Sequence, residues 1–195
     1  MAWKGIQIGM IDIRPLTAFD AARFGEIAGG YTSYQHYVVR REESDHGTTF
    51  TIELEELDQP YTRQWDYDEE LHSRYRQVIA EQGLSLGAYD GDLLIGVAIA
   101  ERRDWNRSLW VWEFHIHPDY RGQGIGRRLM DALADRARRA GLCVIVCETQ
   151  NTNVPAIRFY RRVGFELDGI DLSYYPPEID EIAFFMKCKL SIGRI

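Results

Sequence analysis

The sequence predicts a single α/β domain built on a mixed, twisted sheet flanked by helices. A chain of 195 residues that is 45% hydrophobic, with only six prolines, has the size and composition of one globular domain. From Leu84 onward, strand-like runs alternate with helix-like runs. Within that part, the order strand, helix, apolar strand over 109–147 is typical of a right-handed βαβ crossover.

The first 83 residues show fewer regular patterns. Four segments have the periodicity of regular structure: 11–14 and 49–54 as strands, and 18–28 and 68–81 as helices. Gly29-Gly30 ends the first of these helices. In the run 49–54, alternation places Thr51, Glu53 and Glu55 on one strand face. The rest of the region up to about Gly83 gives no clear pattern.

The second half of the chain is more regular. Strands are expected at 84–89, 93–101, 109–116, 142–147, 165–168 and 181–189. Asp90-Gly91 between the first two supplies the positive φ of a tight hairpin. One helix follows 121–126 and ends at Gly141, and the next begins at Asn153, a good N-cap, and ends at Gly164.

The charge balance limits the partners of the chain. The net charge is −7, which argues against nucleic acid as the main partner, because phosphate binding needs clustered positive charge. The acidic residues are concentrated in 1–70, where the net charge is −8, and this part suits a cation. Four aromatic residues, Trp105, Trp110, Trp112 and Tyr120, are candidates either for the wall of a pocket or for the core.

Membrane and export signals are missing from the sequence pattern. Residues 1–10 lack the apolar core of a signal peptide, and no run approaches the ~20 apolar residues of a membrane span. The three cysteines, Cys143, Cys147 and Cys188, show no zinc spacing and fit reduced thiols. A cytoplasmic protein without membrane contact is expected.

The strongest local signal is the glycine turn Arg121-Gly122-Gln123-Gly124-Ile125-Gly126, between a strand and an amphipathic helix. Glycines let the backbone approach a ligand closely, and the free amides of a helix N-terminus favour phosphate. A pyrophosphate is the expected ligand of this turn. The third glycine of a dinucleotide fingerprint would fall on Arg127, so that motif is excluded. A turn that serves chain geometry alone is the alternative.

Arg121-x-x-Gly124-x-Gly126, with Asn153, Ala156, Tyr160, Gly164 and Phe165 downstream, resembles the coenzyme motifs of the GNAT acyltransferase superfamily. The resemblance implies the GNAT (acyl-CoA N-acyltransferase) fold over 1–195, with 1–83 on the acceptor side, 84–168 as the acetyl-CoA-binding core and 169–195 as a C-terminal strand region. It implies acetyl-CoA as co-substrate. The implied coenzyme-binding residues are Phe114, His115, Ile116, Arg121, Gly122, Gln123, Gly124, Ile125, Gly126, Arg127, Asn153, Ala156 and Tyr160.

A narrower likeness concerns the acceptor. Residues 148–156, then Tyr160, Gly164-Phe165 and Gly169-Ile170-Asp171-Leu172, are similar to streptothricin acetyltransferases. This likeness implies a small cationic amine as acceptor and a role in antibiotic resistance. Because the acceptor side is acidic, Glu53 and Glu55 are the candidate acceptor-binding residues.

Acetyl transfer to an amine requires an acceptor for the amine proton and a proton for the departing thiolate. Glu113 lies in an apolar strand, where a carboxylate is either functional or paired with an arginine or a backbone donor. Its position eight residues before Arg121 resembles that of the catalytic glutamate in part of the superfamily. The resemblance assigns Tyr160 to the coenzyme sulfur as proton donor, the alternative being an ordinary core aromatic. His115 and His117 have the spacing of a ligand pair without further support, so no metal is expected.

The sequence therefore predicts an acetyl-CoA-dependent N-acetyltransferase that acts on a small-molecule amine by direct attack in a ternary complex. Two alternatives stay open: a protein lysine or N-terminal acetyltransferase, and a coenzyme-A-binding regulatory module without turnover. Glu113 together with Tyr160 favours an enzyme, because a binding module needs neither group. A homodimer is one assembly that the sequence allows.

Overall fold

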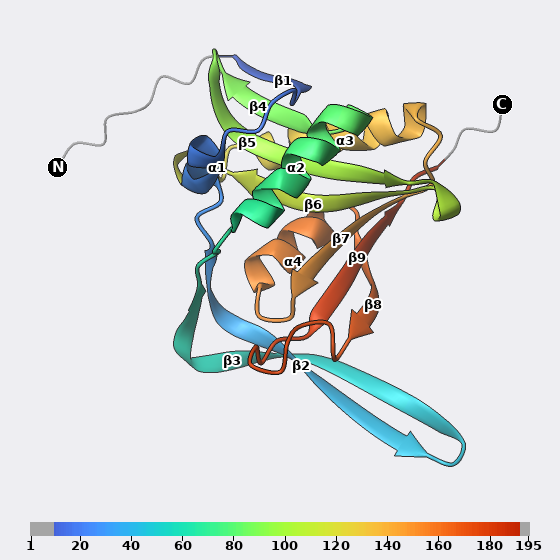
Figure 1. Ribbon diagram of the computed structural model, residues 1–195. Coiled ribbons are helices and arrows are strands. Elements are labelled where there is room, and N and C mark those ends of the chain that lie inside the picture. The colour runs from blue at the N-terminus through green and yellow to red at the C-terminus, as the bar shows by residue number, and fades with distance from the viewer. Residues whose placement is uncertain (1–9, 192–195) are drawn as a thin grey trace. The chain divides into compact units, whose positions relative to one another are not determined.

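The computed structural model of the chain describes residues 10–191 (Figure 1). The prediction made for residues 1–10 therefore lies almost wholly outside the described part. The chain divides into two compact units, which are treated separately below. Within the described residues, unit 1 comprises 10–29, 66–145 and 189–191, and unit 2 comprises 30–65 and 146–188. No helix within 10–191 is both long and apolar enough to cross a membrane, and the cytoplasmic location stays a prediction.

Unit 1 is a four-stranded antiparallel arrangement with three helices. Its elements are β1 (Ile11–Pro15), α1 (Ala21–Ile27), α2 (Glu69–Gln82), β4 (Leu86–Asp90), β5 (Leu93–Arg103), β6 (Ser108–Ile116) and α3 (Ile125–Arg139), with short 3₁₀ turns at Asp104–Asn106 and Pro118–Tyr120. The strand order is β1-β4-β5-β6, and each neighbouring pair is antiparallel. The predicted hairpin of β4 and β5 around Asp90-Gly91 is confirmed, with Gly91 at φ +60°.

Two apolar clusters cover the two faces of these strands. On one face, α1 and α2 bury aromatic and aliphatic side chains against Val97 and Ile99 of β5. On the other face, Ile125 at the start of α3 packs with Ile95 and Tyr120. Figure 1 shows α2 in front of the strands and α3 behind them. β5 therefore contributes side chains to both clusters, and the irregular pairing of β4 with β5 beside Ile95 accompanies this change of face.

Side-chain caps set the helix ends of unit 1. Asp68 accepts a hydrogen bond from the Leu71 amide at 2.8 Å, and Gly83 at φ +59° ends α2, which confirms the helix predicted over 68–81. Asp20 caps α1 in the same way, so this helix begins at Ala21 and not at Ala18 as expected. The expected start was wrong because an N-cap residue has extended and not helical backbone.

A β-bulge interrupts the pairing of β5 with β6. Ile99 pairs with Glu113 and Ala100 pairs with Val111, so Trp112 is an extra residue in β6. The side chains on both sides of this irregularity meet residues of α2. Trp112 packs against the apolar cluster that α2 helps to form, and Glu113 accepts a hydrogen bond from Tyr75 of α2. The bulge therefore aims two consecutive side chains of β6 at the same helix.

Unit 2 combines a long hairpin with a smaller α/β part. Its elements are β2 (Tyr31–Ser44), β3 (Gly47–Arg63), β7 (Val144–Gln150, whose first two residues belong to unit 1), α4 (Val154–Arg162), β8 (Glu166–Asp171) and β9 (Ala183–Lys189, whose last residue belongs to unit 1). The strand order is β7-β9-β8, and β8 and β9 are antiparallel. Asn151 ties the hairpin to this part, because its side chain donates to the Tyr37 carbonyl at 2.8 Å and accepts from the Ile182 amide at 2.8 Å.

The β2–β3 hairpin corrects the sequence interpretation of 30–63. Only 49–54 is expected as a strand there, whereas two strands of 14 and 17 residues are present. Residues 40–51 are exposed without exception, so neither face of the hairpin tip imposes the alternation of apolar and polar residues that the prediction relies on. At the C-terminal end the differences are smaller, because β8 runs on to Asp171 and β9 begins only at Ala183.

Candidate functional site

The glycine turn lies in unit 1 at the start of α3. Gly122 and Gly124 both have φ +78°, a left-handed conformation that side chains rarely adopt. Gly124 is the N-cap residue of α3 and makes no side-chain cap hydrogen bond. A Cβ placed on either glycine would meet no protein atom within 4 Å, so the space over the turn is open. The open turn and the amides of the first turn of α3 can accommodate a pyrophosphate.

Three hydrogen bonds hold this turn in place. Arg121 donates from Nε to the Ile116 carbonyl at 2.9 Å, which ties the turn to the end of β6. Gln123 donates to the Asp119 carbonyl at 3.2 Å, and Arg128 donates to the Ile11 carbonyl at 2.7 Å. Burial lowers the pKa of Arg121 from its ordinary value. Two of the coenzyme segments predicted from sequence, 114–116 and 121–127, are therefore brought together.

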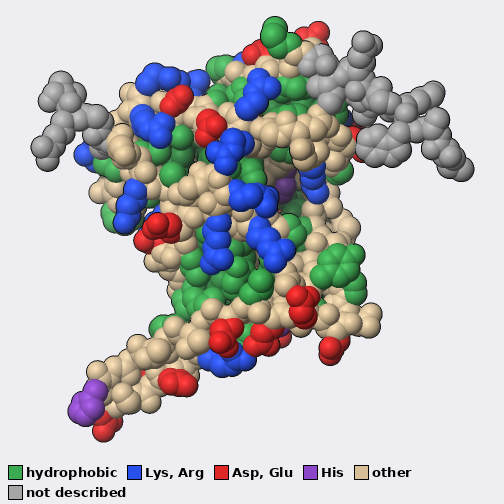
Figure 2. Space-filling view, turned by 180° about the vertical axis from the view of Figure 1, so that it is seen from behind, with side chains coloured by type: hydrophobic (Ala, Val, Ile, Leu, Met, Phe, Trp, Pro, Cys, Tyr) green, Lys and Arg blue, Asp and Glu red, His purple; other side chains and the backbone are tan. Residues whose placement is uncertain are grey.

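The helix that starts at the glycine turn is strongly basic. It carries the arginines Arg127, Arg128, Arg136, Arg138 and Arg139 and has no acidic residue in its first turn. Figure 2 shows the molecule from the side on which α3 lies, and Lys and Arg side chains gather over this region. The positive charge suits the phosphates of a coenzyme, although the chain as a whole is acidic.

The second predicted coenzyme segment lies in unit 2, on α4. Asn153 caps this helix as predicted, and its Oδ1 accepts from the Ala156 amide at 3.2 Å. Tyr160 is 8% exposed and packs against Phe159 and Phe165. Burial raises the pKa of the neighbouring Cys147 thiol, and a hydrogen bond with Tyr160 opposes that rise in part. Cys147 is thus a packing residue and not a thiolate nucleophile at neutral pH.

Glu113 lies at the centre of a hydrogen-bonded cluster in unit 1. The Tyr75 hydroxyl donates to Oε1, and the Tyr67 hydroxyl donates to Oε2 at 3.3 Å. Nε2 of His115 lies 2.5 Å from the same Oε2. The Glu113 and His115 side chains are only 13% and 17% exposed. The expected alternative partners, an arginine or a backbone donor, are not the ones found here; two phenols and an imidazole take their place.

The electrostatics of this cluster favour protonated tyrosines. Burial is the largest cause that raises the pKa of Tyr67 and of Tyr75 above the ordinary value near 10, and the Glu113 carboxylate is the next. Both phenols therefore keep their protons throughout the neutral range and act as donors to Glu113. Three side-chain donors thus meet the Glu113 carboxylate in a largely buried position.

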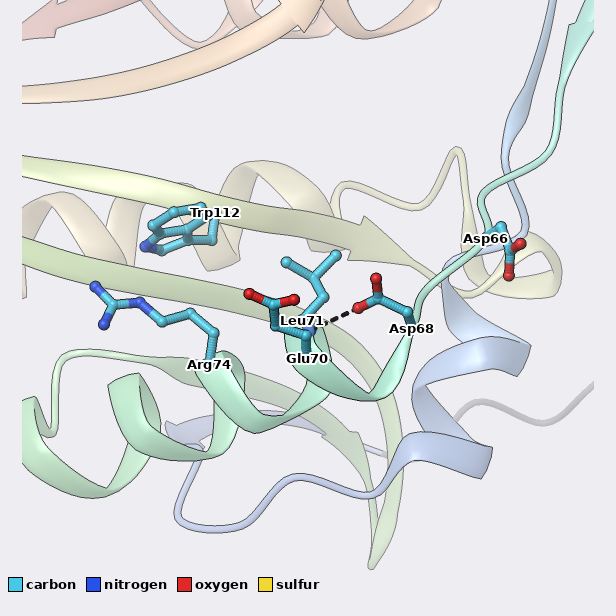
Figure 3. Close-up of a pocket in the computed structure, with 6 residues that line it drawn as sticks. All are labelled: Asp66, Asp68, Glu70, Leu71, Arg74 and Trp112. Carbon is cyan, nitrogen blue, oxygen red and sulfur yellow. Dashed lines mark hydrogen bonds between the residues drawn. The ribbon is translucent and has the colours of Figure 1, made fainter. Parts of the chain in front are cut away.

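A pocket of about 440 Å³ lies beside this cluster, also within unit 1 (Figure 3). Its lining consists of Asp66, Asp68, Glu70, Leu71, Arg74 and Trp112. Figure 3 shows five of these side chains on α2 or the segment just before it, and Trp112 across from them on β6. Three carboxylates against one arginine make the pocket acidic. Of the four candidate wall aromatics, only Trp112 lines it, whereas Trp105 is 85% exposed and Tyr120 belongs to the core.

Glu53 and Glu55 lie in unit 2, on the hairpin strand β3. They share a face as predicted, because both form ion pairs with Arg40 of β2. Both side chains are about half exposed, at 58% and 42%. Arg40 offsets part of their charge, so they form a weaker cation site than the sequence suggests. Their role in binding the acceptor stays a prediction.

Sequence reasoning missed three partners of Glu113, namely Tyr67, Tyr75 and the side chain of His115. Tyr75 has the helical spacing of a core residue, and nothing in its pattern marks a hydroxyl contact with a strand 38 positions away. The i, i+2 spacing of Glu113 and His115 was the available signal, since it places both side chains on one strand face. Within residues 10–191, no group of three or more His, Cys, Asp or Glu side chains has metal-binding geometry.

Comparison with known proteins decides the family. Residues 48–165 match the acetyltransferase (GNAT) family, which is more than half of the chain. The chain belongs to the acetyltransferase (GNAT) family. At the level of this family, the prediction of an acetyl-CoA-dependent N-acetyltransferase is confirmed.

Two relatives of the chain are streptothricin acetyltransferases, the group to which residues 148–172 are similar. The GNAT chain is 42% identical over 92 residues to streptothricin acetyltransferase of Streptomyces lavendulae, a match that covers 47% of this chain and spans only about half (48%) of that protein. It is 27% identical over 138 residues to streptothricin acetyltransferase A of Bacillus subtilis (strain 168), covering 70% of this chain and 78% of that protein.

The fold comparison covers nearly the whole chain. The crystal structure of nourseothricin acetyltransferase matches with a TM-score of 0.74 and 29% identity, over 93% of this chain and 99% of that one. A Bacillus anthracis str. Ames structure in complex with acetyl coenzyme A matches with a TM-score of 0.71 at 22% identity, over 93% and 98% of the two chains. The predicted GNAT fold, a mixed sheet flanked by helices, is confirmed.

Proposed function

We propose that this GNAT chain transfers acetyl from acetyl-CoA to a primary amine of a small acceptor that carries further positive charge, as streptothricin does. The observation that carries the proposal lies within unit 1. The buried Glu113 cluster directly follows Trp112, which walls an acidic pocket. A group that takes up a proton thus lies next to a cavity that favours a cation. The likeness to streptothricin acetyltransferases supports the same acceptor class.

The chain's own residues fit the coenzyme. When bound, acetyl-CoA supplies the acetyl thioester that the amine attacks. The open glycine turn and the basic first turn of α3 hold the pyrophosphate, and strand residues 114–116 hold the pantetheine arm. The family resemblance assigns Asn153 and Ala156 of α4 to the coenzyme as well. These assignments rest on the turn geometry and on the family resemblance.

Proton transfer involves the Glu113–His115 cluster, which accepts the amine proton, and Tyr160, which protonates the leaving sulfur. An alkylamine with a pKa near 10.4 is almost wholly protonated at pH 7, so it must lose a proton before it attacks. The cluster of Glu113 and His115 takes up that proton. Tyr160 donates to the departing sulfur, and its phenol suits this role because its ordinary pKa near 10 keeps it protonated. The amine attacks directly, without an acetylated enzyme.

The test is a panel of amines offered to the purified chain with acetyl-CoA, with release of the coenzyme thiol as the readout. We expect turnover with streptothricin, and little or none with peptides that present an N-terminal alanine or an internal lysine. Preferred acetylation of a peptide would support a protein acetyltransferase instead. The peptides are included because the chain is also 34% identical over 103 residues to N-alpha-acetyltransferase RimI of Mycobacterium tuberculosis (strain ATCC 25618 / H37Rv). Coenzyme binding without turnover on any amine would support a regulatory module.

A substitution in the glycine turn tests coenzyme binding. Acetyl-CoA should raise the melting temperature of the wild type, because a ligand that binds only the folded state stabilises it. Gly124→Val should abolish that rise, since a branched side chain disfavours φ +78° and fills the open space over the turn. Gly141→Val is the matched control, because Gly141 has φ +74° at the other end of α3. A full ligand-induced rise in folded Gly124→Val would contradict the phosphate assignment.

Salt and charge substitutions test the acidic pocket. The KM for a cationic acceptor should increase with ionic strength, because the Debye length shrinks from about 10 Å at 0.1 M to about 3 Å at 1 M. The double variant Asp66→Asn/Glu70→Gln should raise that KM further while leaving the KM for acetyl-CoA unchanged. Glu53→Gln/Glu55→Gln provides the comparison on the hairpin, where Arg40 already offsets the charge and a smaller rise is expected. If the acceptor KM is insensitive to salt and to both variants, these carboxylates are only solvated surface charges and do not bind the acceptor.

A further inference from the structure

The contact between His115 and Glu113 fixes where the imidazole proton lies. Nε2 of His115 and Oε2 of Glu113 are 2.5 Å apart, on side chains that leave the same face of β6. An ionised carboxylate oxygen can only accept a hydrogen bond, so Nε2 must carry the proton that joins the two atoms. In the neutral imidazole, the other ring nitrogen, Nδ1, is then without a proton and can accept one.

The carboxylate itself already accepts three hydrogen bonds. Oε1 accepts from Tyr75, and Oε2 accepts from Tyr67 and from His115. Oε2 already accepts two donors, so only Oε1 has an acceptor site left for a further proton.

Nδ1 of His115 is in a different situation. Among residues 10–191, no hydrogen bond to Nδ1 is present, and the one buried side-chain oxygen or nitrogen without a partner belongs to Glu181. Nδ1 is therefore open to a ligand or to water. The groups that surround the ring are Glu113, Tyr67, whose hydroxyl lies 3.5 Å from Nε2, and Phe24, whose ring is edge-on at 6.0 Å.

We propose that His115 is a further catalytic residue, which takes the proton of the acceptor amine on Nδ1, and that Glu113 is the positioning residue that holds Nε2–H toward itself. The inference rests on the proposed acetyl transfer and names the atom that accepts the proton. Protonation of Nδ1 creates an imidazolium beside the Glu113 carboxylate, and the ion pair stabilises it. The arrangement is that of an imidazole oriented by a carboxylate.

The acceptor ammonium gives its first proton to Nδ1, and the neutral amine nitrogen forms the new bond to the acetyl carbon. When the carbon–sulfur bond breaks, the sulfur leaves with the electron pair and takes the Tyr160 proton. The second proton leaves the new amide nitrogen and restores Tyr160 through solvent. Nδ1 then releases the first proton, so each turnover yields one amide, one thiol and one proton.

His115→Gln is the decisive variant, because glutamine still presents an N–H toward Glu113 but cannot accept the amine proton. We expect kcat to fall by about 10²–10⁴-fold, the usual worth of a proton-transfer group. In the wild type, kcat/KM should decrease toward acidic pH as the base becomes protonated, and His115→Gln should lose this acidic limb of the profile. His117→Gln, two positions along the chain, is the matched control and should keep the wild-type profile.

Nitrogen-15 NMR of the labelled histidines gives a readout that does not depend on turnover. The signal that disappears in His115→Gln should show a neutral ring with its proton on Nε2. A proton on Nδ1 in the neutral ring would overturn the proposal, as would a His115→Gln enzyme with wild-type kcat and pH profile. Wild-type protein that acetylates no amine would instead refute the proposed function, and the NMR result would still decide the state of His115.

Discussion

Tyr160→Phe is expected to lower kcat by about 10²–10⁴-fold while leaving the dissociation constant of acetyl-CoA close to that of the wild type. The substitution removes one hydroxyl, which is needed chiefly as negative charge develops on sulfur, so the loss falls on the transition state. The aromatic ring, which packs against Phe159 and Phe165, is retained. Steady-state kinetics and a binding titration of the same preparation measure the two effects.

The control for this variant is Tyr37→Phe. Tyr37 is also buried in unit 2, and its hydroxyl accepts from Arg161 of α4 at 2.8 Å, so its loss perturbs the same helix without touching the sulfur site. Tyr37→Phe should keep kcat within a few-fold of the wild type. If Tyr160→Phe keeps wild-type kcat under conditions in which chemistry limits turnover, Tyr160 is a core aromatic and the sulfur is protonated by another group.

Glu113→Gln should lower kcat/KM by a similar factor, about 10²–10⁴-fold at neutral pH. Glutamine cannot hold the negative charge that stabilises the proton taken from the amine. The defect should shrink as pH rises toward the amine pKa near 10.4, because the neutral fraction of the amine itself increases roughly tenfold per pH unit. A pH–rate profile of variant and wild type from pH 6 to 9.5 checks the prediction.

Glu101→Gln is a useful comparison for Glu113→Gln. Glu101 is a neighbouring carboxylate on β5 that accepts from Arg74 and from Trp112, and it makes no contact with Tyr67, Tyr75 or His115. It should alter acceptor KM more than the pH profile. A Glu113→Gln profile parallel to that of the wild type at every pH would show that Glu113 has no part in proton transfer.

The sequence was sufficient for the regular parts of the fold because periodicity and caps were both present there. The amphipathic pattern of α3, the helical periodicity of α2, the Asn153 cap of α4 and the Asp90-Gly91 hairpin are local signals that the structure confirms. The β2–β3 hairpin lacked such a signal, because its tip is exposed on both faces and no pattern of burial is imposed on it.

In the candidate site too, some features have a local sequence signal and others do not. The glycine turn and Glu113 are visible in sequence, since one has unusual backbone demands and the other is a charge in an apolar strand. The bulge that turns Trp112 and Glu113 toward α2 depends on pairing between two strands, and the tyrosine donors come from residues 38 and 46 positions away. Local patterns carry no information on such distant contacts.

The most direct test of the account is a competition between acceptors. Streptothricin and a peptide with an N-terminal alanine, at equal concentration, are incubated with the wild-type chain and a limiting amount of acetyl-CoA, and both products are measured by mass spectrometry. We expect the acetyl group to be found almost entirely on streptothricin, at one amine per molecule. Acetyl found mainly on the peptide, or consumed by neither acceptor, would contradict this expectation.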